Sequence, residues 1–219
     1  QRLEEVFAGA FGVNYAISHV NGTVTMHSAL AAAGVGPGDE VIVPSLTMAS
    51  TAFVALYVGA TPVFADISPD TLTIDPDEVR QKISPRTRAV IPVSLYGLSP
   101  DMDPIMEIAR RHKLLVIEDA AHSIGTEYKG KRIGSFGDTQ VFSFHPNKNM
   151  TTGEGGCVAT REENLAGDVA LLRFHGMDRE AWNRFGKKGS QHYEIIAPGY
   201  KYNMMDMQAA LGLHQLRAL

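Results

Sequence analysis

The segment 141–156 carries the side chains of this sequence that are best suited to chemistry. A predicted strand leads into a turn with Ser143 and, five residues later, Lys148, and the segment leaves through a glycine-rich stretch ending at Gly156. Such a turn can point one amine into a cleft, and glycine lets the backbone approach a ligand closely. An isolated lysine in a loop more often lies in solvent. The residues alone leave both interpretations of Lys148 open.

Two neighbouring carboxylates and a histidine follow the apolar run 114–117. Glu118 and Asp119 end this predicted strand, and His122 comes three residues later. A carboxylate at the carboxyl end of a strand is well placed to hold a cationic group in a cleft. The same residues could instead cap a helix and leave the histidine in solvent. Both interpretations remain open at this point.

Gly22 and Thr23 lie between a predicted strand and a predicted helix. The first backbone N–H groups of a helix lack partners within it and attract anions, so this junction, with the Thr23 hydroxyl, could bind a phosphate. Asn21, just before it, also favours capping of a helix. The junction is therefore either a phosphate site or an ordinary helix cap.

These three segments lie within a regular alternation of short apolar runs and helical patterns. The runs predicted as strands are 15–18, 40–44, 62–66, 88–94, 114–118, 139–144 and 156–160. The predicted helices are 23–33, 48–58, 102–112, 162–174 and a short one that begins after Asp75, where Pro76 and Glu78 are typical of a first turn. This alternation predicts an α/β fold of three α/β/α layers with a mostly parallel sheet. Reactive groups are then expected at the carboxyl ends of the strands.

The composition is that of an ordinary globular chain. The 219 residues suffice for one large domain, and 44% apolar with 20% charged residues excludes disordered or collagen-like classes. There are 20 Lys and Arg against 24 Asp and Glu, a formal net charge of −4, and no dense basic run. We therefore expect neither a nucleic-acid partner nor an anionic membrane partner.

The only cysteine, Cys157, excludes an internal disulfide and a zinc site built from several thiolates, and we expect no metal. No apolar run approaches the roughly 20 residues of a membrane span, and no signal-peptide pattern is present at the N-terminus. The expected location is therefore the cytoplasm. The first residue is not Met and an amphipathic pattern is still running at Leu219, so both ends are expected to be cut.

Common nucleotide-binding and hydrolase motifs have no support in this sequence. The glycine-rich segment 34–38 follows a helix and precedes a strand, which is the reverse of the order in a dinucleotide-binding loop. No P-loop, H-E-x-x-H or G-x-S-x-G motif occurs. The function has to be sought in the three segments described above.

Six segments carry a family resemblance when they are taken in order along the chain. They are GPGDEV at 36–41, GATPVF at 59–64, VIEDAA at 116–121, GSFGD at 134–138, Lys148 with TTGEGG at 151–156, and RFHG at 173–176. Together they resemble the DegT/DnrJ/EryC1/StrS family of pyridoxal-phosphate-dependent sugar aminotransferases, from about Phe7 to the end of the chain. The resemblance implies the aspartate-aminotransferase-like fold, fold type I. Residues 1–219 would form its large cofactor-binding domain.

The resemblance implies a role for each reactive residue. Lys148 would form the Schiff base with the aldehyde of pyridoxal phosphate and would later move a proton between the substrate carbon and the cofactor. Asp119 would pair with the pyridinium nitrogen, so that the ring acts as an electron sink. His122 would lie near the ring hydroxyl.

The resemblance also implies a phosphate site and an active site shared between subunits. Gly22, Thr23 and Val24, together with Ser143, would bind the cofactor phosphate. Asn203, in the segment GYKYN at 199–203, would reach into the neighbouring subunit's site. The protein would therefore be a homodimer with shared active sites.

Several features depart from the commonest pattern of the family. Met48 stands where an aromatic residue usually stacks on the cofactor ring, although a thioether can pack on the same face. Ser94 replaces a frequent His. Family members also have a small C-terminal domain that helps to close the site, and the resemblance implies that this domain would lie beyond Leu219.

The reaction implied by the resemblance is transfer of an amino group, from glutamate, to a keto group of a nucleotide-linked sugar. The GYKYN segment is similar to that of enzymes resembling the aminotransferase that makes UDP-4-amino-4-deoxy-arabinose, which favours a 4-keto sugar. Alternatives are a sugar dehydratase of the family, which typically has His at the position of Lys148, and a non-catalytic scaffold with this fold. Arg184, Lys187 and Lys188, within the polar stretch 177–196, could meet a substrate diphosphate or lie in a solvated loop.

Overall fold

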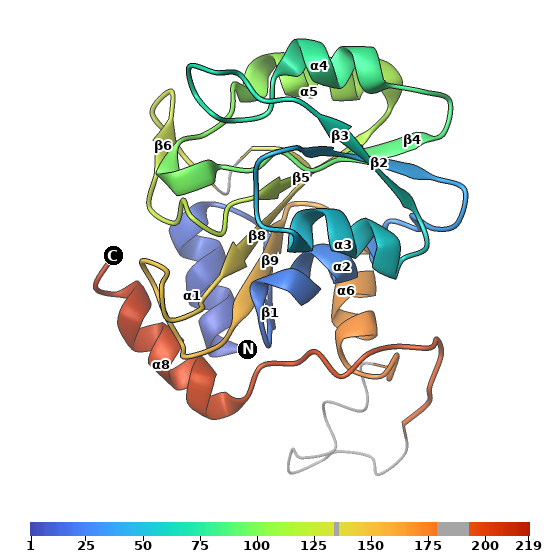
Figure 1. Ribbon diagram of the computed structural model, residues 1–219. Helices are drawn as coiled ribbons and strands as arrows, with labels where there is room; N and C mark the ends of the chain where they lie inside the picture. The colour runs from blue at the N-terminus through green and yellow to red at the C-terminus, as the bar shows by residue number, and fades with distance from the viewer. Residues whose placement is uncertain (134–135, 179–192) are drawn as a thin grey trace.

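The computed structural model describes residues 1–133, 136–178 and 193–219 (Figure 1). Its centre is a seven-stranded sheet with the spatial order β1-β9-β8-β5-β4-β2-β3. The strands are β1 (Tyr15–His19), β2 (Glu40–Pro44), β3 (Thr61–Ala65), β4 (Thr87–Val90), β5 (Leu115–Asp119), β8 (Thr139–Ser143) and β9 (Gly156–Thr160). A separate two-stranded hairpin consists of β6 (Glu127–Tyr128) and β7 (Lys131–Arg132).

The sheet is mostly parallel, as the sequence predicts. Strand β9 runs antiparallel to both of its neighbours, β1 and β8, whereas the pairs β8–β5, β5–β4, β4–β2 and β2–β3 are parallel. The carboxyl ends of β1, β2, β4, β5 and β8 therefore meet at one edge of the sheet. This edge is where segments far apart in the sequence come together.

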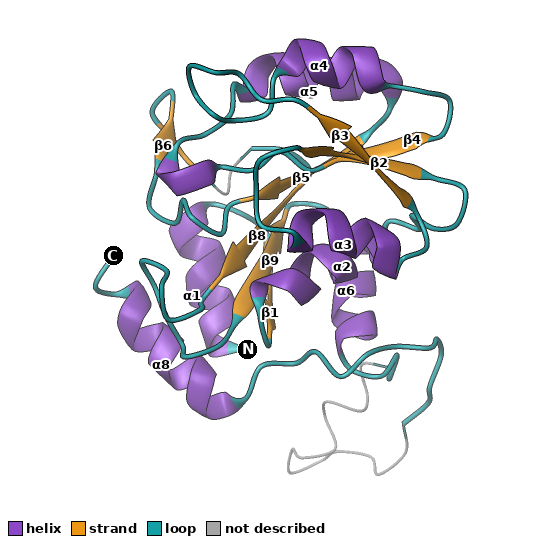
Figure 2. Cartoon of the chain, viewed as in Figure 1, coloured by secondary structure: helices purple, strands orange, loops and turns teal. Residues whose placement is uncertain are grey.

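Helices cover both faces of the sheet (Figure 2). The helices are α1 (Arg2–Phe11), α2 (Gly22–Ala32), α3 (Ser50–Tyr57), α4 (Pro76–Lys82), α5 (Met102–His112), α6 (Glu163–Arg173) and α8 (Asp206–Leu216), with a 3₁₀ turn, η1 (Leu95–Gly97). Within the described residues, no helix combines the length and the apolar character needed to cross a membrane.

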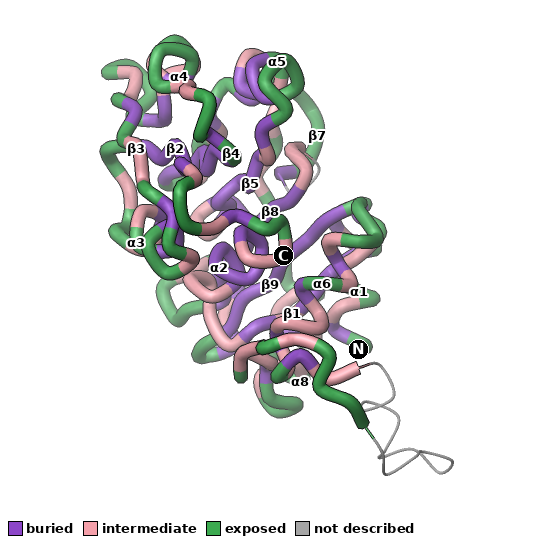
Figure 3. The backbone as a smooth tube through the Cα atoms, turned by 90° about the vertical axis from the view of Figure 1, so that its right-hand side faces the viewer, coloured by how far each residue is buried: buried purple, intermediate pink, exposed green. Residues whose placement is uncertain are grey.

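Three groups of buried side chains account for the layers, one on one face of the sheet and two on the other. On one face, Leu30 of α2, Val54 of α3 and Val169 of α6 pack with the sheet residue Ile117. On the other face, α1 and α8 pack over β8 and β9, while α4 and α5 pack over β2, β4 and β5. The buried backbone runs through the strands in the middle of the molecule, with exposed segments outside (Figure 3). The three-layer architecture is confirmed.

Local sequence signals explain where some elements begin and end. Asp75 caps α4 by accepting a hydrogen bond from the Asp77 N–H at 2.8 Å, and Pro76 occupies the first helical position as predicted. The predicted strand 88–94 is shorter in the structure, where β4 ends at Val90. Pro92 has no N–H to donate to a neighbouring strand, although its carbonyl accepts from the Asp119 N–H at 2.9 Å. Beyond it, the pairing with β5 takes the form of an isolated bridge between Val93 and Asp119.

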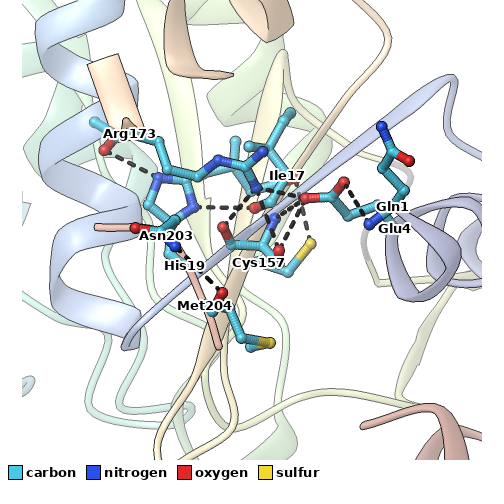
Figure 4. A network of polar contacts seen from close by, with 11 residues as sticks. Gln1, Glu4, Ile17, His19, Cys157, Arg173, Asn203 and Met204 are labelled. Carbon is cyan, nitrogen blue, oxygen red and sulfur yellow. Dashed lines mark hydrogen bonds and ion pairs between the residues drawn. The ribbon is translucent and has the colours of Figure 1, made fainter. Parts of the chain in front are cut away.

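A buried polar network fixes α1 and α6 to the sheet (Figure 4). The Arg173 guanidinium binds the Glu4 carboxylate and donates to the Ser18 carbonyl at 2.8 Å. Glu4 also accepts from the N–H and the hydroxyl of Ser18, at 2.9 and 2.8 Å. Burial alone would raise the pKa of Glu4, but Arg173 and the Ser18 N–H together hold it below its usual value. The ionised carboxylate is therefore stabilised by folding.

We expect Glu4→Gln to lower the free energy of unfolding at neutral pH by about 3 kcal/mol, because the buried Arg173 loses the negative charge of the Glu4 carboxylate. A carboxyl group with a lowered pKa in the folded state stabilises the protein above its unfolded pKa, and this stability is lost as the pH falls through the folded pKa. Urea unfolding at a series of pH values should show that decline in the wild type and a weaker one in Glu4→Gln. Glu5→Gln, at the exposed neighbouring position, is the control; equal effects of the two changes would contradict the prediction.

Candidate active site

A cavity of about 770 Å³ opens at the carboxyl edge of the sheet. Its walls come from the junction of β1 and α2, the segment before α3, the turn η1, and the ends of β5 and β8. This volume is in the range of small-molecule sites, and the position is the one expected of a parallel sheet. The predicted residues that line it are Gly22, Thr23, Met48, Asp119, His122, Ser143 and Lys148.

Asp119 is the last residue of β5 and is a buried part of the cavity lining. One carboxylate oxygen accepts from the Ala121 N–H at 3.1 Å, and the other accepts from the Thr51 hydroxyl at 3.3 Å. Burial raises the pKa of Asp119, while these hydrogen bonds and the charges of His122 and Lys148 oppose the rise. A cationic ligand would favour the ionised form further, so Asp119 is suited to holding a positive group.

Lys148 and His122 lie close enough to Asp119 to interact electrostatically with it. Burial lowers the pKa of Lys148, and the charge of Asp119 opposes this. Burial also lowers the pKa of His122, assisted by the charge of Lys148 and opposed by that of Asp119. The turn holds Lys148 through its N–H, which donates to the His145 carbonyl at 3.0 Å. The site thus combines a buried acid, an amine that loses its proton more easily than usual, and an imidazole that favours the neutral form.

The N-terminus of α2 lies against Ser143 at the end of β8. A methyl group added to Gly22 would lie 2.8 Å from the Ser143 Cβ, so this close approach requires glycine. Asn21 caps the helix by accepting from the Val24 N–H at 3.0 Å. The N–H groups of Gly22 and Thr23 precede the first intrahelical bonds and lie at the cavity wall. One junction therefore combines the helix cap with a cradle suited to an anion.

Gly22→Ala is expected to lower the free energy of unfolding by about 1–3 kcal/mol, the usual cost of forcing atoms into a packed site. It should also weaken anion binding at the α2 N-terminus, because the helix must move away from Ser143. Thermal unfolding with and without pyridoxal phosphate measures both effects. Gly9→Ala in α1 is the matched control, since an added methyl there meets nothing within 4 Å. A Gly22→Ala protein as stable as Gly9→Ala would contradict the packing argument.

Val24, Ser94 and Asn203 do not line the cavity. The Val24 N–H is used by the helix cap. Met48, which does line the cavity, has 73% of its surface exposed. Ser94 is buried behind the cavity, where its hydroxyl donates to Glu118 at 2.9 Å. Asn203 forms an isolated bridge with His19, the last residue of β1 (Figure 4). It does not contribute to the wall of this chain's own cavity. Its role remains a prediction. Arg184, Lys187 and Lys188 lie outside the described residues.

Among the residues that sequence reasoning missed, two have side chains in direct contact with a predicted site residue. Thr51, near the start of α3, donates to Asp119 although 68 residues separate them. Tyr96 stacks on His122 and also lines the cavity. A position just after a strand was the one available signal for Tyr96, while nothing in the local pattern marks Thr51. Among the described residues, no cluster of three or more His, Cys, Asp or Glu side chains could hold a metal ion.

A profile of the DegT/DnrJ/EryC1/StrS aminotransferase family matches residues 1–219. The chain therefore belongs to this family, whose members are pyridoxal-phosphate-dependent sugar aminotransferases. The sheet order and the cavity at the carboxyl edge are those of an α/β protein with a small-molecule site. The family match identifies the class of this α/β protein as the pyridoxal-phosphate-dependent aminotransferases.

Curated relatives and solved structures agree with the family. The chain is 50% identical over its whole length to the spore coat polysaccharide biosynthesis protein SpsC of Bacillus subtilis, and covers 56% of that protein. It is 49% identical to GDP-perosamine synthase of Caulobacter vibrioides, over 98% of this chain and 55% of that protein. The fold matches an aminotransferase from Psychrobacter cryohalolentis with a TM-score of 0.93 and 37% identity, over 99% of this chain and 55% of that one. The chain thus spans little more than half the length of these relatives.

The residues present fit pyridoxal phosphate, the cofactor of the family. A sugar aminotransferase of this fold from Streptococcus pneumoniae, Spr1654, described as putative, has been solved in its pyridoxal-phosphate form, with a TM-score of 0.90 and 33% identity over 99% of this chain and 58% of that one. In the present chain, Asp119 offers a buried acid to a cationic ring nitrogen, and Lys148 offers an amine with a lowered pKa. The glycine cradle at Gly22 and Ser143 offers N–H and O–H donors to a phosphate.

Proposed function

We propose that the protein containing this chain is an aminotransferase that moves an amino group from an amino acid, glutamate, to a keto group of a nucleotide-linked sugar. The observation that carries this proposal is the convergence of Lys148, Asp119 and the α2 N-terminus on one cavity of about 770 Å³. These groups come from three separate parts of the chain. A scaffold protein has no physical need to place an acid, an amine and an anion cradle around the same space.

In the proposed reaction, each of the site residues has a separate role. When bound, pyridoxal phosphate supplies an electron-accepting ring for breaking a C–H bond beside an amine. Asp119 would hold negative charge for the ring nitrogen, in a buried place where water screens that charge weakly. Lys148 takes and returns the proton, because its lowered pKa makes the neutral, basic amine more available than in an ordinary lysine. The α2 N-terminus and Ser143 would hold the phosphate and so orient the ring.

The proposed substrate class rests on the family and on the printed names of relatives. One relative is a GDP-perosamine synthase and another belongs to spore coat polysaccharide biosynthesis. These names favour a sugar destined for a polysaccharide and carried by a nucleotide. The GYKYN segment at 199–203 favours a 4-keto sugar. Lys148 argues against the dehydratase alternative, in which His typically stands at this position.

An absorbance spectrum of the purified protein with added pyridoxal phosphate tests the proposal. We expect a band at the violet end of the visible range, which shifts when glutamate is added. Screening of nucleotide-linked keto sugars should then restore the first spectrum. A protein that shows no band and no response to glutamate or any other amino donor would overturn the proposal.

We further propose that the protein works as a homodimer in which each subunit completes the other's site. In support, Asn203 does not line this chain's own cavity. Large apolar side chains are also exposed on α3 and on the segments that flank it, as on a surface covered by a partner. They are Leu46, Met48, Phe53, Leu56, Tyr57 and Phe64. Two of them, Leu46 and Met48, belong to the cavity wall, which places this apolar surface next to the site.

Mixing two inactive variants tests the shared site. Asn203→Ala and Lys148→Ala subunits, unfolded and refolded together, should regain up to about a quarter of the wild-type activity, because a random heterodimer carries one site with neither change. Each variant refolded alone is the control. Mass measurement must show that heterodimers have formed. Heterodimers without recovered activity would contradict the sharing of Asn203 between subunits while leaving the aminotransferase proposal intact.

A further inference from the structure

The turn η1 at the mouth of the cavity carries a strained residue, Tyr96. Its backbone lies in the left-handed region, with φ 51° and ψ 29°, and Gly97 follows with φ 86°. A side chain in this region crowds its own backbone, and glycine is the residue that normally adopts it. Five non-glycine residues in the described part of the chain have positive φ, and Tyr96 is the one among them that lines the cavity.

The strained backbone directs two groups of Tyr96 onto His122. The rings of the two residues stack, with centroids 5.6 Å apart and planes inclined by 19°. The Tyr96 N–H points at the Nδ1 atom of His122, at 3.4 Å. The opposite side of the phenol ring is open, since 83% of the Tyr96 surface is exposed. Burial of its own side chain therefore does not explain why Tyr96 keeps this backbone.

The rest of the turn is anchored to β5, the strand that ends at Asp119. The Ser94 N–H donates to the Asp119 carbonyl at 3.0 Å, and the Ser94 hydroxyl donates to Glu118 at 2.9 Å. A hydrogen bond from Leu98 to the Leu95 carbonyl, at 3.0 Å, closes the turn. Strain persists where the surroundings over-determine a conformation, and it gathers at functional sites. Here the surroundings tie Tyr96 to the same strand end that positions Asp119 and His122.

We propose that Tyr96 is a positioning residue of the active site, whose left-handed backbone brings its ring and its N–H onto His122 and so fixes the orientation and tautomer of the imidazole. With Nδ1 accepting from the Tyr96 N–H, the proton of the neutral ring lies on Nε2. His122 then offers a hydrogen-bond donor to a ligand in the cavity. This inference rests on the proposed function only in taking that cavity as the active site.

The charged neighbours of His122 set the background against which Tyr96 acts. Burial lowers the pKa of His122, the positive Lys148 lowers it further, and the negative Asp119 raises it. The phenol ring of Tyr96 stacks on the imidazole and so keeps water from one of its faces. The backbone N–H of Tyr96 favours an unprotonated Nδ1 in His122. Both contributions point toward the neutral ring. Loss of Tyr96 should therefore make His122 easier to protonate.

Nuclear magnetic resonance of the cofactor-free protein, labelled with ¹⁵N-histidine, reads the tautomer and the titration of His122 directly. The His122 signal is assigned among the eight histidines by its loss in His122→Asn. Tyr96→Gly removes the ring and frees the backbone, and Tyr96→Asn removes the ring while tolerating the left-handed region. Tyr96→Phe keeps the ring. Leu72→Gly is the matched control, because Leu72 also has a left-handed backbone, φ 58°, but does not line the cavity.

Tyr96→Gly and Tyr96→Asn are expected to raise the titration midpoint of His122 by at least about 0.5 pH unit. Tyr96→Gly should also lose the preference for a proton on Nε2. Tyr96→Phe and Leu72→Gly should match the wild type. Melting temperatures of both glycine variants should stay within about 2 °C of the wild type, because relief of strain offsets the entropy of glycine.

A His122 titration and tautomer unchanged in Tyr96→Gly, or changed equally in Leu72→Gly, would overturn the inference. These measurements need neither cofactor nor activity. Failure of the proposed function would appear instead as a missing absorbance band in the wild-type protein. The two failures are therefore distinguishable.

Discussion

Replacing Lys148 with alanine is expected to slow amino transfer by at least about 10³-fold, because one change removes both a nucleophile and a proton-transferring group. The fold should persist. The Lys148 side chain is only half-buried, and its N–H can still donate to the His145 carbonyl after the change. Single-turnover absorbance with glutamate measures the rate, and thermal unfolding reports on the fold.

One further variant, Lys148→Arg, separates the effect of losing the reactive amine from the effect of losing its positive charge, and a second variant is the control. Lys148→Arg keeps a positive charge near Asp119 but cannot lose its proton at ordinary pH, so it should be as slow as Lys148→Ala. Lys131→Ala, on the exposed strand β7, is the control and should leave the rate unchanged. A Lys148→Ala rate within about tenfold of the wild type, a barrier change near 1.4 kcal/mol, would refute the assignment of Lys148.

The alternation of strands and helices could be predicted because each element carries its own signal. Helix α5 occupies 102–112 as predicted, and α4 starts where Asp75 and Pro76 indicate. The ends of β4 could not be predicted as well, because they depend on which backbone groups find partners across the sheet. The hairpin of β6 and β7 was missed, since its two-residue strands are too short to give a periodic pattern.

The candidate site could be predicted in its chemistry but not in its supporting contacts. Asp119, Ser143 and Lys148 were indicated by their position just after apolar runs, and the parallel sheet brings such positions to one edge. The hydrogen bond from Thr51 to Asp119 depends on how α3 packs over that edge, which no local pattern encodes. The strain at Tyr96 also belongs to the folded backbone, so the sequence alone shows only an ordinary tyrosine before a glycine.

Asp119→Asn is expected to slow amino transfer by about 10²–10³-fold, the usual cost of removing one preorganised electrostatic group. The amide is nearly the same size as the carboxylate and can still accept from Thr51 or from the Ala121 N–H. It carries no negative charge for a ring nitrogen. Because burial raises the pKa of Asp119, a neutral amide at this place should cost the fold little. Single-turnover rates, with thermal unfolding as a check, test both expectations.

The neighbouring residue Glu118 provides a matched control for Asp119. Consecutive residues of a strand point to opposite faces, so Glu118 faces away from the cavity, where it accepts from the Ser94 hydroxyl at 2.9 Å. Burial raises the pKa of Glu118 to about 7, so its charge is already partly lost at neutral pH. Glu118→Gln should therefore slow the reaction far less than Asp119→Asn, although both changes neutralise a buried acid of the same strand. Equal losses in the two variants would mean that total buried charge controls the rate, and the specific place of Asp119 beside the ligand would be refuted.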